Sequence, residues 1–275
     1  MKPTDYPKIL LVGRSGSGKT SSLRNLMLPQ VALINGDDKA LPFPKANLGH
    51  YEEVMKASAI SIRLQQIDKM DNISVVILDS ITILGESVES ELALIHNNGF
   101  DLYADYKKIM FKIIRSIKKM NKIVIVTAIS EVIEATAMKG GVMTTSQNLC
   151  AALQGQKMRG RLEANFTMVM FSQMKDKEYV METNNGNSNT AKTPLGMYEG
   201  RRFIPNDLLP VLERVYEFYT IGNTLALPPT YTTSSSKLLR LSLHVKTLAS
   251  TCLHVTWRSQ VMERFLQDKM KQVMS

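Results

Sequence analysis

Short runs of apolar residues alternate with helix-like stretches along the N-terminal half of the chain. Four such runs predict buried strands, at residues 8–12, 31–35, 74–78 and 122–128. Between the third and fourth runs, apolar residues recur at three- and four-residue spacing, which predicts an amphipathic helix. Its apolar positions are Leu102, Tyr106, Ile109, Ile113, Ile117 and Met120. Continuous apolar strands that alternate with helices favour an α/β fold, with a mostly parallel sheet flanked by helices.

The pattern changes towards the C-terminus. Two runs, 166–171 and 178–182, predict a hairpin, and a helix follows it to about residue 219. Beyond that helix the chain is rich in Pro, Thr and Ser, which is typical of a linker. We therefore expect a core domain over residues 1–220, a linker over 221–236 and a tail over 237–275. Apolar positions near the end of the tail predict a terminal amphipathic helix.

Composition and charge restrict the class of protein. The chain has 275 residues, 44% of them hydrophobic, and its two cysteines imply no disulfide framework. Without a long apolar stretch, we expect no membrane segment and a cytoplasmic location. The net charge is +9; residues 221–275 hold seven basic and two acidic side chains, which leaves +5 there and +4 elsewhere. This balance is compatible with a polyanionic partner such as nucleic acid.

A nucleotide-binding loop joins the first predicted strand to a predicted helix over 19–27. The segment matches G-x-x-x-x-G-K-[ST] at every position. It consists of Gly13, Arg14, Ser15, Gly16, Ser17, Gly18, Lys19 and Thr20. Glycines allow backbone N–H groups to surround phosphate oxygens, Lys19 should reach the β- and γ-phosphates, and the Thr20 hydroxyl should bind Mg²⁺. ATP and Mg²⁺ are therefore the expected cofactors of a Mg²⁺-dependent ATPase.

Three further acidic residues follow predicted strands. Asp79 comes directly after 74–78, where a P-loop protein needs a second ligand on the magnesium side. Asp37 and Asp38 follow 31–35, at the edge of a parallel sheet where ligands bind. Either one is a candidate to orient the attacking water, and an Asn-Gly-Asp-Asp turn explains the same residues equally well.

The ordered motifs LVGRSGSGKT, INGDDKALPF, VVILDSITIL and IVIVTA resemble those of RecA-like strand-exchange ATPases. The chain is more closely similar to the small phage-encoded RecA-like ATPases of the Sak type, which act in single-strand annealing and recombination. NGNSNTAKTPLGMYE and IPNDL extend the resemblance over roughly residues 7 to 220. It implies a RecA-like P-loop core and an ATPase that binds single-stranded DNA. It also implies a homo-oligomeric ring or filament with nucleotide at subunit interfaces, a single-strand-binding protein as a further partner, and, for a phage-encoded chain, the cytoplasm of a bacterial host.

The resemblance also assigns roles to residues. Asp37, rather than Asp38, falls where the family carries the carboxylate that activates water, and Ser80 matches the family's Asp-Ser pair. Lys192 falls where a basic residue of a neighbouring subunit touches the γ-phosphate. Residues 131–157 and 85–100 fall where RecA-like proteins carry two DNA-binding loops.

One departure from the family concerns the end of the fourth core strand. The family carries a polar sensor there, whereas this chain has Ala128-Ile129, with Ser130 as the nearest polar residue. We therefore expect slow or DNA-stimulated hydrolysis.

Candidate DNA-binding residues lie in and after the segment 131–157. They are Lys139, Lys157, Arg159 and Arg161. These cations are suited to phosphates of single-stranded DNA, and the last two are equally suited to a subunit interface. The lysines and arginine of the periodic helix fit a solvated face or phosphate contact. Two functions follow: a recombinase that assembles on single-stranded DNA and promotes annealing or strand exchange, or a loader of other proteins without direct DNA contact.

Overall fold

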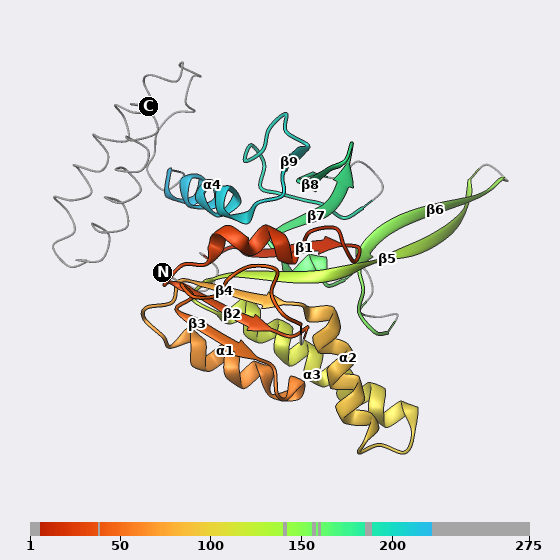
Figure 1. Cartoon of the computed structure of the whole chain (residues 1–275). Coiled ribbons are helices and arrows are strands. Elements are labelled where there is room, and N and C mark those ends of the chain that lie inside the picture. The colour runs from red at the N-terminus through yellow and green to blue at the C-terminus, as the bar shows by residue number, and fades with distance from the viewer. Residues whose placement is uncertain are drawn as a thin grey trace, which may run out of the picture. The chain divides into compact units, whose positions relative to one another are not determined.

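Nine strands form one mixed sheet in the computed structural model of this chain (Figure 1). The structure describes residues 6–37, 39–139, 142–155, 158, 161–184 and 189–221, and their side chains except at 135–146 and 220–221. The strands are β1 Lys8–Gly13, β2 Val31–Asn35, β3 His50–Glu53, β4 Val75–Asp79, β5 Ile123–Lys139, β6 Val142–Ala151, β7 Met168–Lys175, β8 Glu178–Glu182 and β9 Phe203–Pro205.

The sheet has a parallel centre and an antiparallel edge. Its order is β3-β2-β4-β5-β1-β7-β8-β9. The first six strands of this order run parallel to one another, β8 runs antiparallel to β7, and β9 runs antiparallel to β8. Strand β5 lies between β1 and β4 and then continues past the sheet, where it pairs with β6 as a hairpin. The carboxyl ends of β1, β2, β4 and the sheet portion of β5 therefore meet at one edge.

Helices cover both faces of the sheet. They are η2 Thr20–Leu26, η3 Ala57–Ala59, α1 Ile60–Asp68, α2 Ile81–Ala93, α3 Gly99–Lys119, η4 Glu163–Asn165 and α4 Leu208–Ile221. Side chains of α1, α2 and α3 share one apolar cluster with the sheet, and those of η2 and α4 share a second cluster. Figure 1 shows the two groups on opposite sides of the strands.

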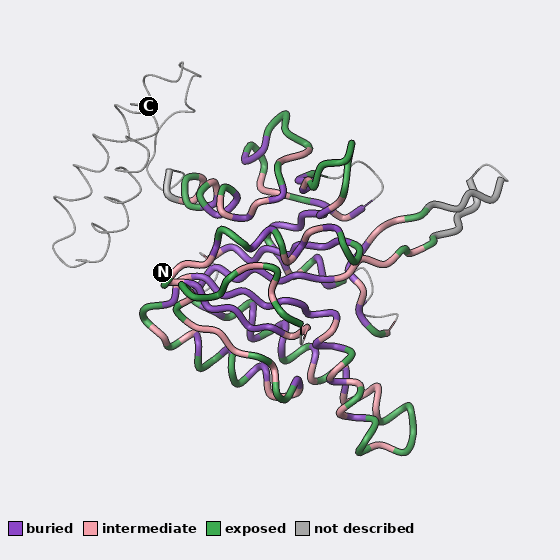
Figure 2. The backbone as a smooth tube through the Cα atoms, in the orientation of Figure 1, coloured by how far each residue is buried: buried purple, intermediate pink, exposed green. Residues whose placement is uncertain are grey.

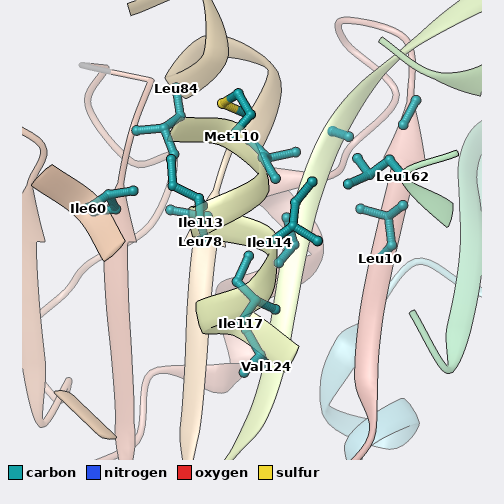
Figure 3. Close-up of a cluster of buried hydrophobic side chains, with 14 of the residues drawn as sticks. Leu10, Ile60, Leu78, Leu84, Met110, Ile113, Ile114, Ile117, Val124 and Leu162 are labelled. Carbon is teal, nitrogen blue, oxygen red and sulfur yellow. The ribbon is translucent and has the colours of Figure 1, made fainter. Parts of the chain in front are cut away.

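Each strand of the centre contributes to both clusters because its side chains alternate between faces. In β1, Leu10 and Val12 face the first cluster, whereas Ile9 and Leu11 face the second. The long helix α3 presents its apolar stripe to the first face. Figure 3 shows four residues of this stripe, Met110, Ile113, Ile114 and Ile117, near Leu78 and Val124 of the sheet. Each such side chain contributes about 1.5–3 kcal/mol when it is fully buried.

The predicted α/β fold, with a mostly parallel sheet between helices, is confirmed. The predicted hairpin is formed by β7 and β8, and the predicted helix after it is α4. The helix predicted over 19–27 is a 3₁₀ helix over Thr20–Leu26.

Two segments expected to be loops have regular structure instead. Most of 131–157 lies in β5 and β6, whose ladder runs from Ser130–Ala151 to Lys139–Val142. Most of 85–100 lies in α2 and its turn into α3. Backbone hydrogen bonding explains both differences, because the two strands pair with each other and α2 is capped by Ser80, whose hydroxyl accepts from Ile83 N at 3.4 Å.

Helix α4 ends at Ile221, so the predicted linker from 222 onwards and the predicted tail lie outside the described residues. Among the helices that are described, none combines the length and the apolar character needed to cross a membrane.

Candidate nucleotide-binding site

The loop 13–20 connects the central strand β1 to η2. Gly16 and Gly18 have φ values of 76° and 90°, which side chains with a Cβ rarely adopt. Arg14, Ser15 and Gly16 are exposed, so this part of the loop is open to solvent. A glycine-rich turn with accessible backbone N–H groups at this position is a phosphate-binding arrangement.

The Lys19 side chain lies inside the loop and binds backbone carbonyls of the same loop. Its side chain is buried, and its ammonium donates to Gly13 O at 2.8 Å and to Arg14 O at 2.9 Å. Burial lowers the pKa of Lys19, and the nearby carboxylates of Asp79 and Asp37 oppose that shift. The loop and the two acids therefore hold the lysine ammonium at the edge where the strands end.

Asp79 is the last residue of β4 and is 2% exposed. Thr20 Oγ1 donates to Asp79 Oδ2 at 2.8 Å, and Thr127 Oγ1 donates to Asp79 Oδ1. Burial raises the pKa of Asp79, while the two threonine hydroxyls lower it. The carboxylate and the Thr20 hydroxyl lie side by side, and hard oxygen ligands of this kind fit Mg²⁺. The structure brings Thr20 and Asp79 together, and their role as Mg²⁺ ligands stays a prediction.

Asp37 reaches the same edge from β2. Ser80 Oγ donates to Asp37 Oδ1 at 2.8 Å, and Gly36 N donates to Asp79 O, so the two strand ends are joined. The Asp79–Ser80 peptide bond is cis. Asp37 is thus placed beside Ser80, while Asp38 lies outside the described residues; the preference for Asp37 comes from the resemblance and stays a prediction.

Thr127 is a site residue that sequence reasoning missed. Leu78 of β4 pairs with Val126 of β5, and this register places the next residues, Asp79 and Thr127, next to each other. A fully buried threonine in the otherwise apolar run IVIVTA was the available signal. Its importance depends on β5 lying beside β4, which the sequence pattern alone does not establish.

A second missed group supports the loop from the other side. Ser172 Oγ donates to Ser17 O at 2.6 Å, and Asn206 Nδ2 donates to Gly18 O at 2.8 Å. The same serine hydroxyl lies 3.2 Å from Asn206 Oδ1, which links the two supports. A Cβ at Gly18 would lie 2.6 Å from Asn206 Nδ2 and 3.1 Å from the Tyr179 ring. The segment IPNDL, noted above only for its resemblance, therefore fixes the conformation of the nucleotide loop.

Lys192 lies apart from this group within one chain. Its backbone exchanges two hydrogen bonds with Val169 of β7, at 2.8 and 2.9 Å. The residue is exposed, and the partial loss of water around its ammonium lowers the pKa of Lys192, a shift that Glu163 opposes. Among the contacts of the described residues, none joins Lys192 to the nucleotide loop, so its action on a neighbouring subunit's nucleotide stays a prediction.

The candidate DNA-binding residues are only partly described. Lys139 ends β5, but its side chain lies outside the described part, as do Lys157 and Arg159. Arg161 is exposed beside a hollow next to α3. The segment 85–100 contains no lysine or arginine, so it offers no cation to a phosphate backbone.

Comparison with known proteins supports the assignment of the loop. A family model described as an AAA domain matches residues 5–195, which is more than half of the 275 residues. The matched range contains the nucleotide loop, Asp37, Asp79 and Lys192. A search of curated proteins gave no match.

Proposed function

The chain belongs to the AAA domain family and has a P-loop ATPase domain, and on this premise we propose that it is a Mg²⁺-dependent, RecA-like ATPase of the Sak type that acts on single-stranded DNA. The observation that carries the ATPase part is the meeting of Lys19, Thr20, Asp79 and Asp37 at one edge of the sheet. Phosphoryl transfer requires a loop that binds phosphates, a cation, ligands for a metal ion and a group that orients the attacking nucleophile, and candidates for all four lie at this edge.

Each residue has a separate task in this proposal. The loop amides and the Lys19 ammonium bind the phosphates and offset the negative charge that develops during transfer. Thr20 and Asp79 would hold Mg²⁺, which supplies charge neutralisation and orientation of the phosphates when it is bound. Asp37, held by Ser80, orients and deprotonates the attacking water.

The experiment for the ATPase is the substitution Lys19→Ala. The variant should lose ATP hydrolysis and bind ATP more weakly, with an unchanged fold, because the side chain points into the loop and not into either apolar cluster. Lys69→Ala is the matched control, since Lys69 is exposed at the end of α1. Hydrolysis by Lys19→Ala at the wild-type rate would remove the loop from the catalytic site.

The DNA part of the proposal rests on the resemblance to Sak-type ATPases and on the cations Lys139, Lys157, Arg159 and Arg161. Aromatic residues are scarce around these positions, so binding should be electrostatic and weakly sequence-specific. Each phosphate contact removed should flatten the log–log salt dependence by roughly 0.7 on a single strand. Replacing Lys139 and Lys157 together by Ala should lower that slope by about 1.4.

The alternative function is a loader that acts on other proteins without touching DNA. ATPase rates with and without single-stranded DNA distinguish the two functions. Stimulation by DNA, with a salt slope that falls in the Lys139/Lys157 double variant, supports the recombinase. An ATPase rate that does not change when single-stranded DNA is added supports the loader function.

A further inference from the structure

The turn between α2 and α3 carries an exposed apolar tip. Leu94, Ile95 and Phe100 are 90%, 72% and 85% exposed, although large apolar side chains are normally scattered singly on a surface. Figure 1 shows this helix pair extending beyond the sheet, and Figure 2 shows its end as exposed. We refer to Leu94, Ile95 and Phe100 together as the knob.

Polar contacts hold the backbone of the knob in place. Asn98 caps α3, because its side-chain oxygen accepts from Asp101 N at 2.8 Å. His96 Nε2 lies 3.1 Å from Asp105 Oδ2, and the amides of Ile95 and His96 both donate to Leu92 O. An apolar tip that is ordered before binding loses less conformational entropy when it docks.

An apolar hollow lies farther along the same helix. It has a volume of about 480 Å³ and is lined by Phe111 and Ile114 of α3 and by Leu153, Met158 and Leu162. Pockets of about 300–1,000 Å³ hold drug-sized ligands, so this hollow can accept the side chains of the knob. Phe111 is 48% exposed, and Lys107 and Arg161 lie at the lining. Within the described residues, neither of these two cations forms an ion pair with an acid.

The two surfaces have opposite charge. Residues 86–105, which flank the knob, contain five acids and no lysine or arginine. The hollow is lined by Lys107 and Arg161 and by no acid within the described residues, and Lys118 lies beside it, 3.3 Å from Asn165 Oδ1. The helix dipole favours this distribution along α3. The helix dipole does not explain why Glu89 and Glu91 lie near the C-terminus of α2, because a helix C-terminus favours cations. Backbone amides of residues 57 and 58 hold Glu91, but Glu89 has no ion pair within the described range.

From these observations we propose that the knob of one copy of this chain docks in the hollow of a second copy. A chain cannot make this contact with itself, because Phe100 and Phe111 are fixed about 16 Å apart on one helix. The acids around the knob would then face Lys107 and Arg161 of the other copy, which sets the orientation of the contact. The nucleotide loop takes no part, so the contact is independent of the proposed ATPase and should persist in Lys19→Ala.

The first test is the substitution Phe100→Asp, followed by sedimentation equilibrium of the full chain over a range of concentrations. The dissociation constant for self-association should rise at least about 30-fold, the effect of losing one interfacial hot spot. Ile62→Asp is the matched control, because Ile62 is an exposed apolar residue on α1, away from the knob and the hollow. A wild-type chain that stays monomeric, or a Phe100→Asp chain that associates like wild type, would overturn the proposal.

The second test identifies the surface that receives the knob. In a Cys252→Ser background, chains carrying Asn97→Cys are mixed with chains carrying Ala164→Cys. Asn97 is exposed between Ile95 and Phe100, so this change keeps the knob, Ala164 is exposed at the lining of the hollow, and Cys150 is buried. Mild oxidation should join one chain of each kind, and adding Phe111→Asp to the Ala164→Cys chain should prevent it. Self-association without this cross-link would place the knob elsewhere and refute the docking in the hollow.

Discussion

Removing the hydroxyl of Thr127 should weaken the magnesium side of the site without disturbing the fold. Thr127→Val keeps the shape of the side chain but deletes one of the two hydroxyl donors to the Asp79 carboxylate. A hydrogen bond to a charged group contributes about 1.5–3 kcal/mol, and each 1.4 kcal/mol is tenfold. The expected loss of Mg²⁺ affinity is therefore about 10- to 100-fold, which is also the usual effect of removing a group that orients a metal ligand.

The loss should grow as the pH falls. Burial already raises the pKa of Asp79, and the Thr127 hydroxyl lowers it. Without that hydroxyl, Asp79 should stay protonated up to a higher pH in Thr127→Val than in wild type. A protonated carboxyl does not bind Mg²⁺. The assay is binding of a fluorescent ATP analogue titrated with Mg²⁺ at several pH values, together with phosphate release.

Thr127→Ser is the control, because it keeps the hydroxyl and deletes only a methyl group. It should bind Mg²⁺ nearly as well as wild type. Equal losses in the Val and Ser variants would show that packing, and not the hydrogen bond to Asp79, is responsible. Wild-type affinity in Thr127→Val would refute the reasoning altogether.

Three further changes test other parts of the molecule. Lys192→Ala should lose hydrolysis and keep ATP affinity, and mixing it with Lys19→Ala should restore part of the phosphate release; no recovery at any ratio would argue against a site shared between subunits. Gly18→Ala and Gly16→Ala both place a side chain at positive φ, which should destabilise the fold by about 1–3 kcal/mol in each case. Only the Cβ at position 18 would also clash with a neighbouring group, the Asn206 amide, so thermal unfolding should show a larger loss of stability for Gly18→Ala. Burial lowers the pKa of Lys8 to about 8, so between pH 8 and 10.5 the unfolded chain binds more protons and stability should rise with pH. Chemical denaturation should show a smaller rise in Lys8→Met than in wild type, and part of the rise should remain because burial also lowers the pKa of Lys19 and Lys122. The variant should also be less stable by about 1–3 kcal/mol for each carbonyl it leaves unpaired. Equal pH profiles would contradict the assignment.

The buried parallel strands could be predicted from the sequence because both of their faces are covered. β1, β2, β4 and the first part of β5 are therefore continuous apolar runs. β3, with the sequence HYEE, has no such run, since it is an edge strand that joins the sheet through backbone hydrogen bonds to β2. Those bonds are made by every residue type except proline at the donor, so they leave little trace in the sequence.

The hairpin of β5 and β6 was missed for a different reason. The resemblance implies a DNA-binding loop over 131–157, and within it Gly140-Gly141 separates two segments of small and polar residues. A Gly-Gly pair between two pairing segments also predicts a two-residue hairpin connection, and the ladder brings Lys139 opposite Val142. Beyond the sheet, the two paired segments lack the continuous apolar run that marks β1, β2 and β4, so their pairing leaves little trace in the sequence.

The candidate site was predictable only where its chemistry is local. The loop and the acid after a buried strand are short patterns with a defined position. Thr127, Ser172 and Asn206 act on groups that are 48, 155 and 188 residues away in the chain, so they could be identified only after the order of the strands was known.

Strand β5 extends from the edge of the nucleotide site to the end of the hairpin that it forms with β6. It is continuous from Ile123 to Lys139, and Thr127 near its base contacts the buried carboxylate of Asp79. From Thr127 to Lys139 there are 12 residues, a length of about 40 Å at about 3.3 Å per residue. A tilt of about 5° at the base would move the far end by about 3.5 Å over that length. The continuous backbone of β5 therefore joins the neighbourhood of the Asp79 carboxylate to the end of the hairpin.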